Sequence, residues 1–96
     1  MSHYVYVLKS RKNGKHYVGE TADLARRLKE HRLETTKSLR GHGPFDIVFF
    51  ETYQNRKDAR KRETYFKTGQ GRRLRGELID KFPRESLRIW QEYLGP

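Results

Sequence analysis

The sequence predicts a mixed α+β fold, in which a three-stranded antiparallel sheet is flanked by helices. Three runs rich in β-branched and aromatic residues indicate strands, at residues 4–8, 16–19 and 45–53. Elsewhere, apolar residues recur three or four positions apart, which indicates amphipathic helices, the last over about residues 83–94. The resulting order β-β-α-β-α-α-α fits one small domain over residues 1–96, with helices packed on the sheet.

Charge and composition narrow the class of protein. The 96 residues include 22 Lys and Arg against 12 Asp and Glu, and the net charge of +10 is spread along the whole chain. This favours a polyanionic partner, nucleic acid before an anionic membrane surface, and a solvated basic surface without a partner is the alternative. The chain has no Cys, which excludes a disulfide scaffold and a Cys-ligated zinc site. No segment has the apolar length of a membrane span or of a signal peptide, so we expect a cytoplasmic protein.

The first two strands form a hairpin whose register decides whether two tyrosines meet. Asn13-Gly14 favours a tight turn between them. A two-residue turn at that point puts Tyr6 and Tyr17 on one face of the sheet but about 13 Å apart. A wider loop that shifts the register by an even number of residues brings them together without changing their faces. We expect the wider loop, although two tyrosines on one face can also be ordinary packing residues.

The first helix is expected to run from a cap at Thr21 or Asp23 to about residue 33. Arg27 and His31 are four residues apart beside its apolar stripe, so their side chains project together. Such a pair usually lies on the surface without a specific role, and only its surroundings can give it a function.

Two further segments are suited to binding an anion. Residues 35–44 are rich in Thr, Ser, Gly and basic residues and form a loop with many hydrogen-bond donors. Residues 69–73, Gly-Gln-Gly-Arg-Arg, stand between two helices, where backbone amides and two arginines can hold a phosphate. Gly69 as the C-cap of the preceding helix explains the glycines equally well. The candidate nucleic-acid-binding residues are Arg27, Lys37, Arg40, Arg72 and Arg73.

The helix expected over residues 56–68, with Asn55 as its cap, carries a charge on the side that should pack inward. Ala59, Glu63 and Phe66 fall on one stripe, and basic residues occupy the opposite faces. Burial of an ionised carboxylate costs free energy unless a cation or hydrogen bonds meet it. Glu63 can therefore pair with an Arg, bind a divalent metal, or lie partly exposed at the rim of the helix interface.

The order and spacing of four features resemble the GIY-YIG nuclease family, especially its small stand-alone bacterial members: Tyr4-Val5-Tyr6, Tyr17-Val18-Gly19, Arg27 with His31, and Glu63. Ten residues separate the two tyrosines, as in that family. The resemblance covers residues 4 to about 80 and implies the same sheet and helices. Tyr4 replaces the Gly of the motif, Val18 replaces its Ile, and the downstream Asn of several larger members is missing.

The resemblance implies metal-dependent hydrolysis of a phosphodiester, with roles carried over by position. Glu63 would hold one divalent ion, Mg²⁺ or Mn²⁺, and Arg27 would stabilise charge on the phosphate oxygens. Tyr6 would be the general base, Tyr17 would position the phosphate or water, and His31 would orient a tyrosine or relay its proton. Since phenol has a pKa of about 10, Arg27 and the metal must favour the phenolate. The polar atoms of all five side chains should lie within about 10 Å of a common point.

The expected function is therefore a structure-selective endonuclease in repair or processing, acting on DNA in preference to RNA. Without a further domain to choose the target, the choice falls to the shape of the substrate or to a protein partner. A nucleic-acid-binding module with weak or lost catalysis is the alternative.

Overall fold

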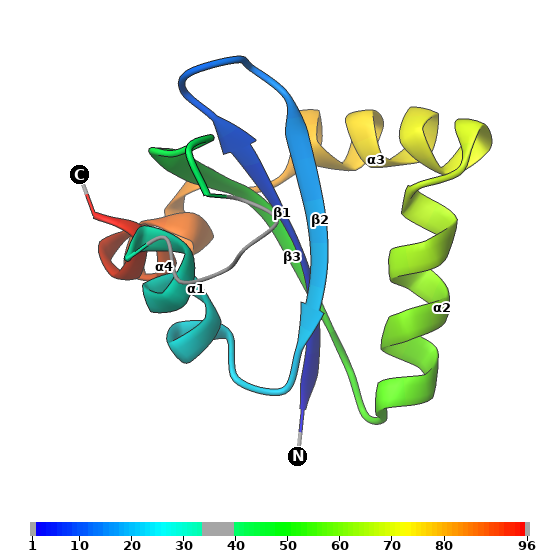
Figure 1. The fold of residues 1–96 in the computed structure, drawn as a ribbon. Coiled ribbons are helices and arrows are strands. Elements are labelled where there is room, and N and C mark those ends of the chain that lie inside the picture. Colours follow the sequence, from blue (N-terminus) through cyan, green and yellow to red (C-terminus); the bar gives the residue numbers. More distant parts are fainter. Residues whose placement is uncertain (1, 34–39, 96) are drawn as a thin grey trace.

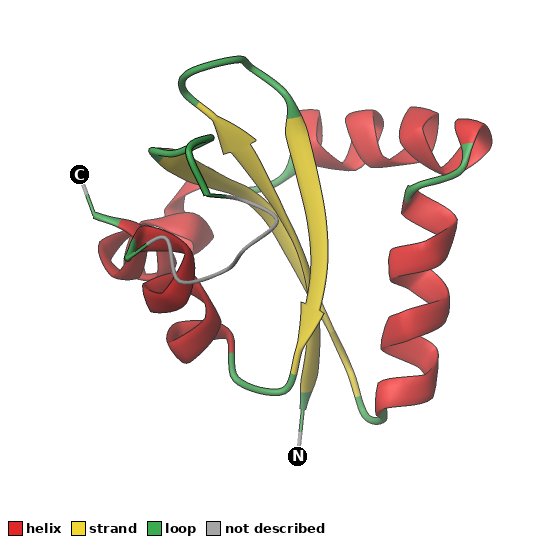
Figure 2. Ribbon diagram, in the orientation of Figure 1, coloured by secondary structure: helices red, strands yellow, loops and turns green. Residues whose placement is uncertain are grey.

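The computed structural model describes residues 2–33 and 40–95 and has a three-stranded antiparallel sheet with helices on both faces (Figures 1 and 2). The predicted fold class is confirmed. The strands, in the spatial order β2-β1-β3, are β1 (His3–Ser10), β2 (His16–Thr21) and β3 (Phe45–Tyr53). The helices are α1 (Leu24–Arg32) and α4 (Arg88–Leu94) on one face, and α2 (Arg56–Phe66) and α3 (Gly69–Lys81) on the other.

The C-terminal helix begins later than the sequence predicts. A 3-10 turn, η2 (Arg84–Leu87), follows Pro83, and α4 starts only after it. None of the helices in the described residues has both the length and the apolar character that a membrane span needs.

The loop between β1 and β2 is the wider one that the two tyrosines require. Tyr6 pairs with Gly19, so Tyr17 stands only two residues further along β2 and on the same face. The loop is closed where the Ser10 N–H donates to the Lys15 carbonyl at 3.0 Å. The predicted register shift is therefore confirmed.

Two clusters of apolar side chains hold the helices to the sheet. The α1-side core consists of Tyr6, Leu8, Leu24, Leu28, Phe45, Ile47 and Leu94. The α2-side core consists of Val5, Val7, Phe49, Ala59 and Phe66. An irregularity in β3 lets that strand serve both, because Val7 pairs with Phe49 whereas Leu8 pairs with Ile47. The extra residue between them reverses the alternation of faces, which explains an apolar run on both sides of β3.

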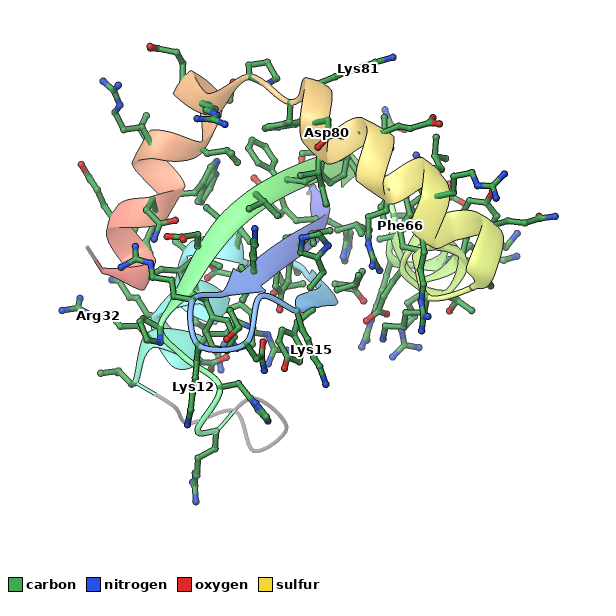
Figure 3. All side chains as sticks on the ribbon, turned by 90° about the horizontal axis from the view of Figure 1, so that it is seen from above. Lys12, Lys15, Arg32, Phe66, Asp80 and Lys81 are labelled. Atoms are coloured by element: carbon green, nitrogen blue, oxygen red, sulfur yellow. The ribbon has the colours of Figure 1, made fainter. Side chains whose placement is uncertain are left out.

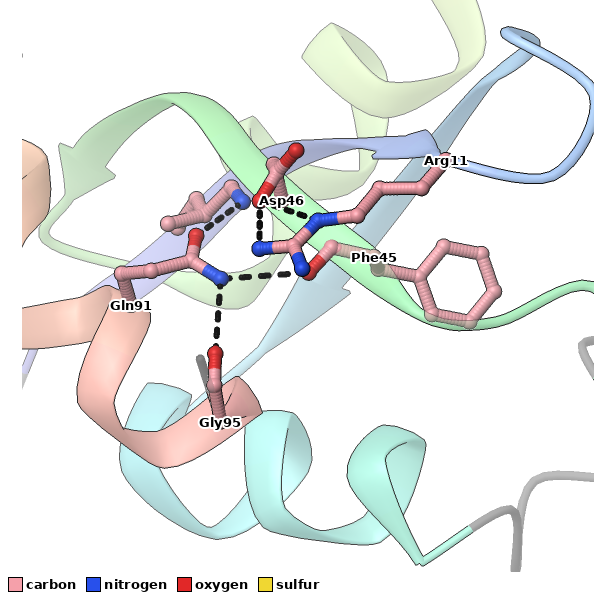
Figure 4. Close-up of polar contacts among 6 residues, drawn as sticks. Arg11, Phe45, Asp46, Gln91 and Gly95 are labelled. Carbon is pink, nitrogen blue, oxygen red and sulfur yellow. Dashed lines mark hydrogen bonds and ion pairs between the residues drawn. The ribbon is translucent and has the colours of Figure 1, made fainter.

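Gln91 fastens α4 to β3, an outer strand of the sheet (Figure 4). Its side-chain oxygen accepts from the Ile47 N–H at 2.9 Å, and its side-chain nitrogen donates to the Phe45 carbonyl at 3.2 Å. These bonds satisfy backbone groups for which an edge strand has no neighbouring strand.

The corner between α2 and α3 corrects the expectation for Gly69. Helix α2 ends at Phe66, and Gly69 begins α3 instead of capping α2. The hydroxyl of Thr68 accepts from the Gly71 N–H at 3.0 Å and so caps α3. Gly71 is buried, and a Cβ there would collide with the Tyr65 carbonyl. A glycine at this position therefore allows the two helices to meet closely.

Candidate active site

A cleft of about 970 Å³ is lined by residues of β2 together with residues of α1, α2 and α3. In Figure 1, α1 lies on one side of β2, and α2 and α3 lie on the other. Since β2 is an outer strand, groups from both faces of the sheet can reach its edge. The five residues predicted to carry the chemistry all line this cleft: Tyr6, Tyr17, Arg27, His31 and Glu63. The structure thus places side chains from β1, β2, α1 and α2 around one concave surface.

Tyr6 and His31 form a buried pair in the wall of the cleft. The Tyr6 hydroxyl lies 2.8 Å from Nε2 of His31, and each residue is only 4% exposed. A side chain at position 19 would collide with the ring and the hydroxyl of Tyr6. Gly19 therefore leaves the space through which Tyr6 crosses β2 to reach the last turn of α1.

The surroundings of this pair keep both groups neutral at neutral pH. Burial is the main reason why the pKa of Tyr6 is raised, and Arg27 opposes the shift while Glu63 adds to it. Burial, and then the charge of Arg27, lowers the pKa of His31 to about 4. The Tyr6 O–H therefore donates to Nε2 of His31, and the imidazole proton resides on Nδ1. That Nδ1 is buried and has no hydrogen-bond partner among the described residues.

Arg27 and Tyr17 lie on the more open part of the wall. The Arg27 side chain is 39% exposed, and its Nη1 is 3.5 Å from Oε1 of Glu30. The ring of Tyr17 packs edge-on against Phe45 at 5.8 Å. The Tyr17 hydroxyl accepts from Nδ2 of Asn13 at 3.2 Å, so the hairpin loop holds it in place.

Glu63 is partly exposed, and its partner among the described residues is Lys67, which directly follows the end of α2. Its side chain is 24% exposed, and Oε2 accepts from Nζ of Lys67 at 3.2 Å. Arg62, the neighbouring residue, instead forms an ion pair with Glu51 at 2.6 Å. An arginine under the helix therefore does not account for Glu63, and its carboxylate faces the cleft.

The donor set of the cleft fits a lightly held hard cation. Mg²⁺ is usually bound by one or two carboxylates, with water and substrate phosphate completing its shell. Glu63 supplies one such carboxylate. Glu20 also lines the cleft, but Arg56 and Arg60 approach it to 3.4 and 3.8 Å. Within residues 2–33 and 40–95, no group of three or more His, Cys, Asp or Glu side chains could form a dedicated metal centre.

The predicted nucleic-acid-binding residues fall into three classes. Arg27 and Arg72 line the cleft. Arg40 and Arg73 are exposed and are not part of its lining. Lys37 lies outside the described residues. The prediction missed three cations and one imidazole that also line the cleft: Lys15, Lys67 and Arg75, and His16. Arg75 could have been predicted from its position one helical turn after Arg72, which places both on one face of α3.

The family model described as the GIY-YIG catalytic domain matches residues 2–75. The chain belongs to the GIY-YIG family. The matched range contains every residue of the cleft lining, from Tyr6 to Arg75. The predicted family is therefore confirmed, and with it a nuclease type of domain whose substrate is nucleic acid.

Among GIY-YIG proteins, the chain is similar to small proteins named UPF0213. It is 42% identical over 65 residues to UPF0213 protein CPE1444 of Clostridium perfringens, which covers 67% of this chain and 69% of the relative. It is 36% identical over 80 residues to UPF0213 protein BH0048 of Halalkalibacterium halodurans, covering 82% and 83% of the two chains. The solution NMR structure of the BH0048 protein from Bacillus halodurans matches with a TM-score of 0.53 and 31% identity, over 88% of this chain and 92% of that one.

Proposed function

We propose that this protein is a divalent-metal-dependent endonuclease that cleaves DNA in preference to RNA and selects its substrate by structure. The observation that carries the proposal is the 2.8 Å bond between the Tyr6 hydroxyl and His31, in the wall of a cleft that Arg27 and Glu63 also line. Hydrolysis of a phosphodiester needs a proton acceptor for the attacking water and positive charge beside the phosphate oxygens. The cleft offers both within one surface.

Tyr6 and His31 can act together as the proton acceptor. As water attacks phosphorus, its proton passes to the Tyr6 oxygen while the phenol proton moves to Nε2 of His31. The bond from phosphorus to the leaving oxygen breaks, and that oxygen departs with the bonding electron pair and takes a proton from solvent. This order avoids a free phenolate, which the raised pKa of Tyr6 disfavours. The cost is a buried imidazolium, since the pKa of His31 is about 4 before substrate binds. The negative charge of a bound phosphate raises that pKa and so reduces the cost.

Arg27 is positioned to stabilise the phosphate, and Glu63 to hold the ion. The exposed guanidinium of Arg27 can bind non-bridging oxygens, on which negative charge increases during attack. A Mg²⁺ or Mn²⁺ ion held by Glu63 would supply Lewis-acid stabilisation of the phosphate and the leaving oxygen. Neutralising the Glu63 carboxylate also removes a charge that raises the pKa of Tyr6.

A nucleic-acid-binding module with weak catalysis is the second candidate. Two observations favour it. Burial raises the pKa of Tyr6, so its phenol stays protonated, and Glu63 is paired with Lys67. A protein that only binds the nucleic-acid backbone would need the cations of the cleft. It would need neither a proton acceptor at Tyr6 nor a free carboxylate at Glu63.

The substitution Glu63→Gln separates the two candidates. We expect cleavage of a panel of branched, nicked and single-stranded DNAs, with matching RNAs, to fall at least ~100-fold in Mg²⁺ or Mn²⁺. Binding in chelator should stay equal or rise, because a negative charge leaves a phosphate-facing surface. The free energy of unfolding should change by less than about 0.5 kcal/mol, since only the exposed pair with Lys67 is lost.

Glu77→Gln is the matched control, because Glu77 is an exposed carboxylate of α3 outside the cleft lining. It should leave all three measurements unchanged. Cleavage that survives Glu63→Gln would remove Glu63 from the mechanism. A wild-type protein that binds but cleaves nothing in the panel would establish the binding module instead.

A further inference from the structure

The cleft has a second group of basic residues that the proposed chemistry does not use. Lys15 and His16 come from the hairpin loop and the start of β2, and Arg72 and Arg75 come from α3. We call these four residues the basic corner. Figure 3 shows Lys15 on the hairpin loop, far along the sequence from the two arginines that share its cleft.

Among the described residues, the cations of the basic corner are not paired with a carboxylate, although Glu20 and Glu63 line the same cleft. In the described part of the chain, no Asp or Glu forms an ion pair with Lys15, Arg72 or Arg75. Burial and then the charge of Arg75 lower the pKa of His16, and burial and then Arg72 lower that of Arg75. An anion bound in this half-enclosed cleft would oppose both shifts and so stabilise the protonated forms of His16 and Arg75.

Arg75 is held in place by backbone and not by a carboxylate. Its Nη1 donates to the Phe66 carbonyl at 2.9 Å, and its Nε is buried without a partner among the described residues. A guanidinium fixed in this way keeps donors for a phosphate, whose geometry it matches. The start of α3 is not the source of the site, because Thr68 already caps the Gly71 N–H.

We propose that the basic corner is a second phosphate subsite, which binds a backbone phosphate of the same strand beside the phosphate that is cut. The volume of the cleft, about 970 Å³, lies at the upper end of the roughly 300–1,000 Å³ of ligand pockets and so exceeds what one phosphate needs. The substrate is then a polynucleotide that places two phosphates in the cleft. The proposal rests on the proposed nuclease function in one respect only, namely that the neighbouring phosphate is the one that is cut.

The test compares Arg72→Gln and Arg75→Gln with Lys81→Gln. Arg72 is exposed, so its substitution should not disturb the fold, whereas Arg75→Gln also removes the bond to Phe66. Lys81 is an exposed cation at the end of the same helix, outside the cleft, and its loss changes the net charge equally (Figure 3). Binding of a labelled single-stranded DNA octamer is measured in chelator over a salt series.

We expect Arg72→Gln and Arg75→Gln to weaken octamer binding about 5–20-fold and to reduce the log–log salt slope by about 0.7 each, the value for one phosphate contact on a single strand. Lys81→Gln should leave the slope unchanged. Inorganic phosphate should compete no better than chloride of equal ionic strength. An Arg72→Gln protein that behaves like Lys81→Gln overturns the proposal. Competition by inorganic phosphate that depends on Arg72 also overturns it, because the corner would then bind free phosphate.

A small substrate separates this proposal from the nuclease proposal. Bis(p-nitrophenyl) phosphate has one phosphate and cannot fill both subsites, so Arg72→Gln should slow oligonucleotide cleavage at least ~5-fold more than it slows cleavage of this ester. If Arg72→Gln slows both substrates equally, the corner is not a separate subsite. If the wild type cleaves neither substrate, the nuclease proposal fails, and the octamer binding series still decides the subsite.

Discussion

The two cores that pack on opposite faces of the sheet differ in what they contain. The α1-side core includes the buried Tyr6 hydroxyl and packs around His31, whose Nδ1 lacks a partner among the described residues. The α2-side core is entirely apolar, and the charged residues of α2 and α3 lie at its rim. Buried polar groups with incomplete hydrogen bonding cost stability. One face therefore carries the pair that we propose accepts the proton, and the other supports the helix from which Glu63 reaches the cleft.

Removal of Phe66 should have the largest effect on stability, because Phe66 belongs to the entirely apolar α2-side core. Phe66 is fully buried, and its ring packs against Phe49 at 5.9 Å and beneath the Arg62 guanidinium at 4.5 Å. We expect Phe66→Ala to lower the free energy of unfolding by about 3–5 kcal/mol. Because Glu63 precedes it by one helical turn, cleavage should fall along with stability. Urea unfolding and cleavage assays of the same preparation measure both.

Tyr6→Phe is the corresponding change on the other face. It keeps the ring and leaves only Nε2 of His31 without its donor, which should cost about 1–2 kcal/mol. Cleavage should nevertheless be lost, since the hydroxyl is the proposed proton acceptor. If Tyr6→Phe destabilises the protein as much as Phe66→Ala, the division between a chemical face and a supporting face is wrong.

Acid should destabilise the α1-side core before it protonates most carboxylates. The folded protein lowers the pKa of His31 from 6.5 to about 4, so the unfolded chain binds the proton more readily between these values. Stability is therefore complete above pH 6.5 and decreases as the pH falls, by about 2–3 kcal/mol at pH 4.5. Urea unfolding at pH 7 and 4.5 measures the loss, which should largely disappear in His31→Gln. A loss that persists in that variant belongs to other groups, such as His16, whose pKa is also lowered.

The parts of the fold that could be predicted from sequence depend on local patterns. Alternation and β-branched residues gave the three strands, and the short polar side chains of Asp23 and Asn55 marked the starts of α1 and α2. The meeting of Tyr6 and Tyr17 followed from the two-residue period of a strand once the hairpin loop was taken as wide. The presence of Arg27, His31 and Glu63 in one cleft was predicted only through the family resemblance.

The remaining features depend on contacts between distant segments, which local patterns do not specify. The glycines of residues 69–71 looked like a helix end, but the approach of α3 to the Tyr65 carbonyl explains Gly71. Of the three alternatives for Glu63, the structure shows the partly exposed position at the rim of the helix interface, where Nζ of Lys67 approaches its carboxylate. Arg72 was predicted to bind nucleic acid, but its grouping with Lys15, His16 and Arg75 was missed, because it depends on how α3 packs beside the start of β2.

Gly19→Ala should have an intermediate effect on stability, because the Tyr6 side chain lies directly over residue 19 of β2. The new methyl group would collide with the Tyr6 ring and hydroxyl, and we expect a loss of about 1–3 kcal/mol together with at least ~10-fold slower cleavage. Gly76→Ala is the control, because nothing lies within 4 Å of a Cβ at that position of α3. It should stabilise the protein by about 0.5–1 kcal/mol without affecting cleavage. Cleavage at the wild-type rate in Gly19→Ala would show that Tyr6 need not lie over residue 19.

Lys67→Gln should have the smallest effect on stability and the most specific effect on the site. Its exposed ion pair with Glu63 contributes about 0.5 kcal/mol or less, so unfolding should hardly change. Without the ammonium, Oε2 of Glu63 becomes available to a cation and a nearby positive charge is gone. We expect calorimetric titration without nucleic acid to show about 2–5-fold tighter Mn²⁺ binding, corresponding to an exposed interaction of up to about 1 kcal/mol. Octamer binding in chelator should weaken, because a cation leaves the cleft.

Lys61→Gln removes the same charge from an exposed position of α2 outside this cleft and should alter neither measurement. Equal Mn²⁺ affinity in wild type and Lys67→Gln would mean that Glu63 is not the ligand, and the rim of the α2-side core would then be a surface for phosphate alone.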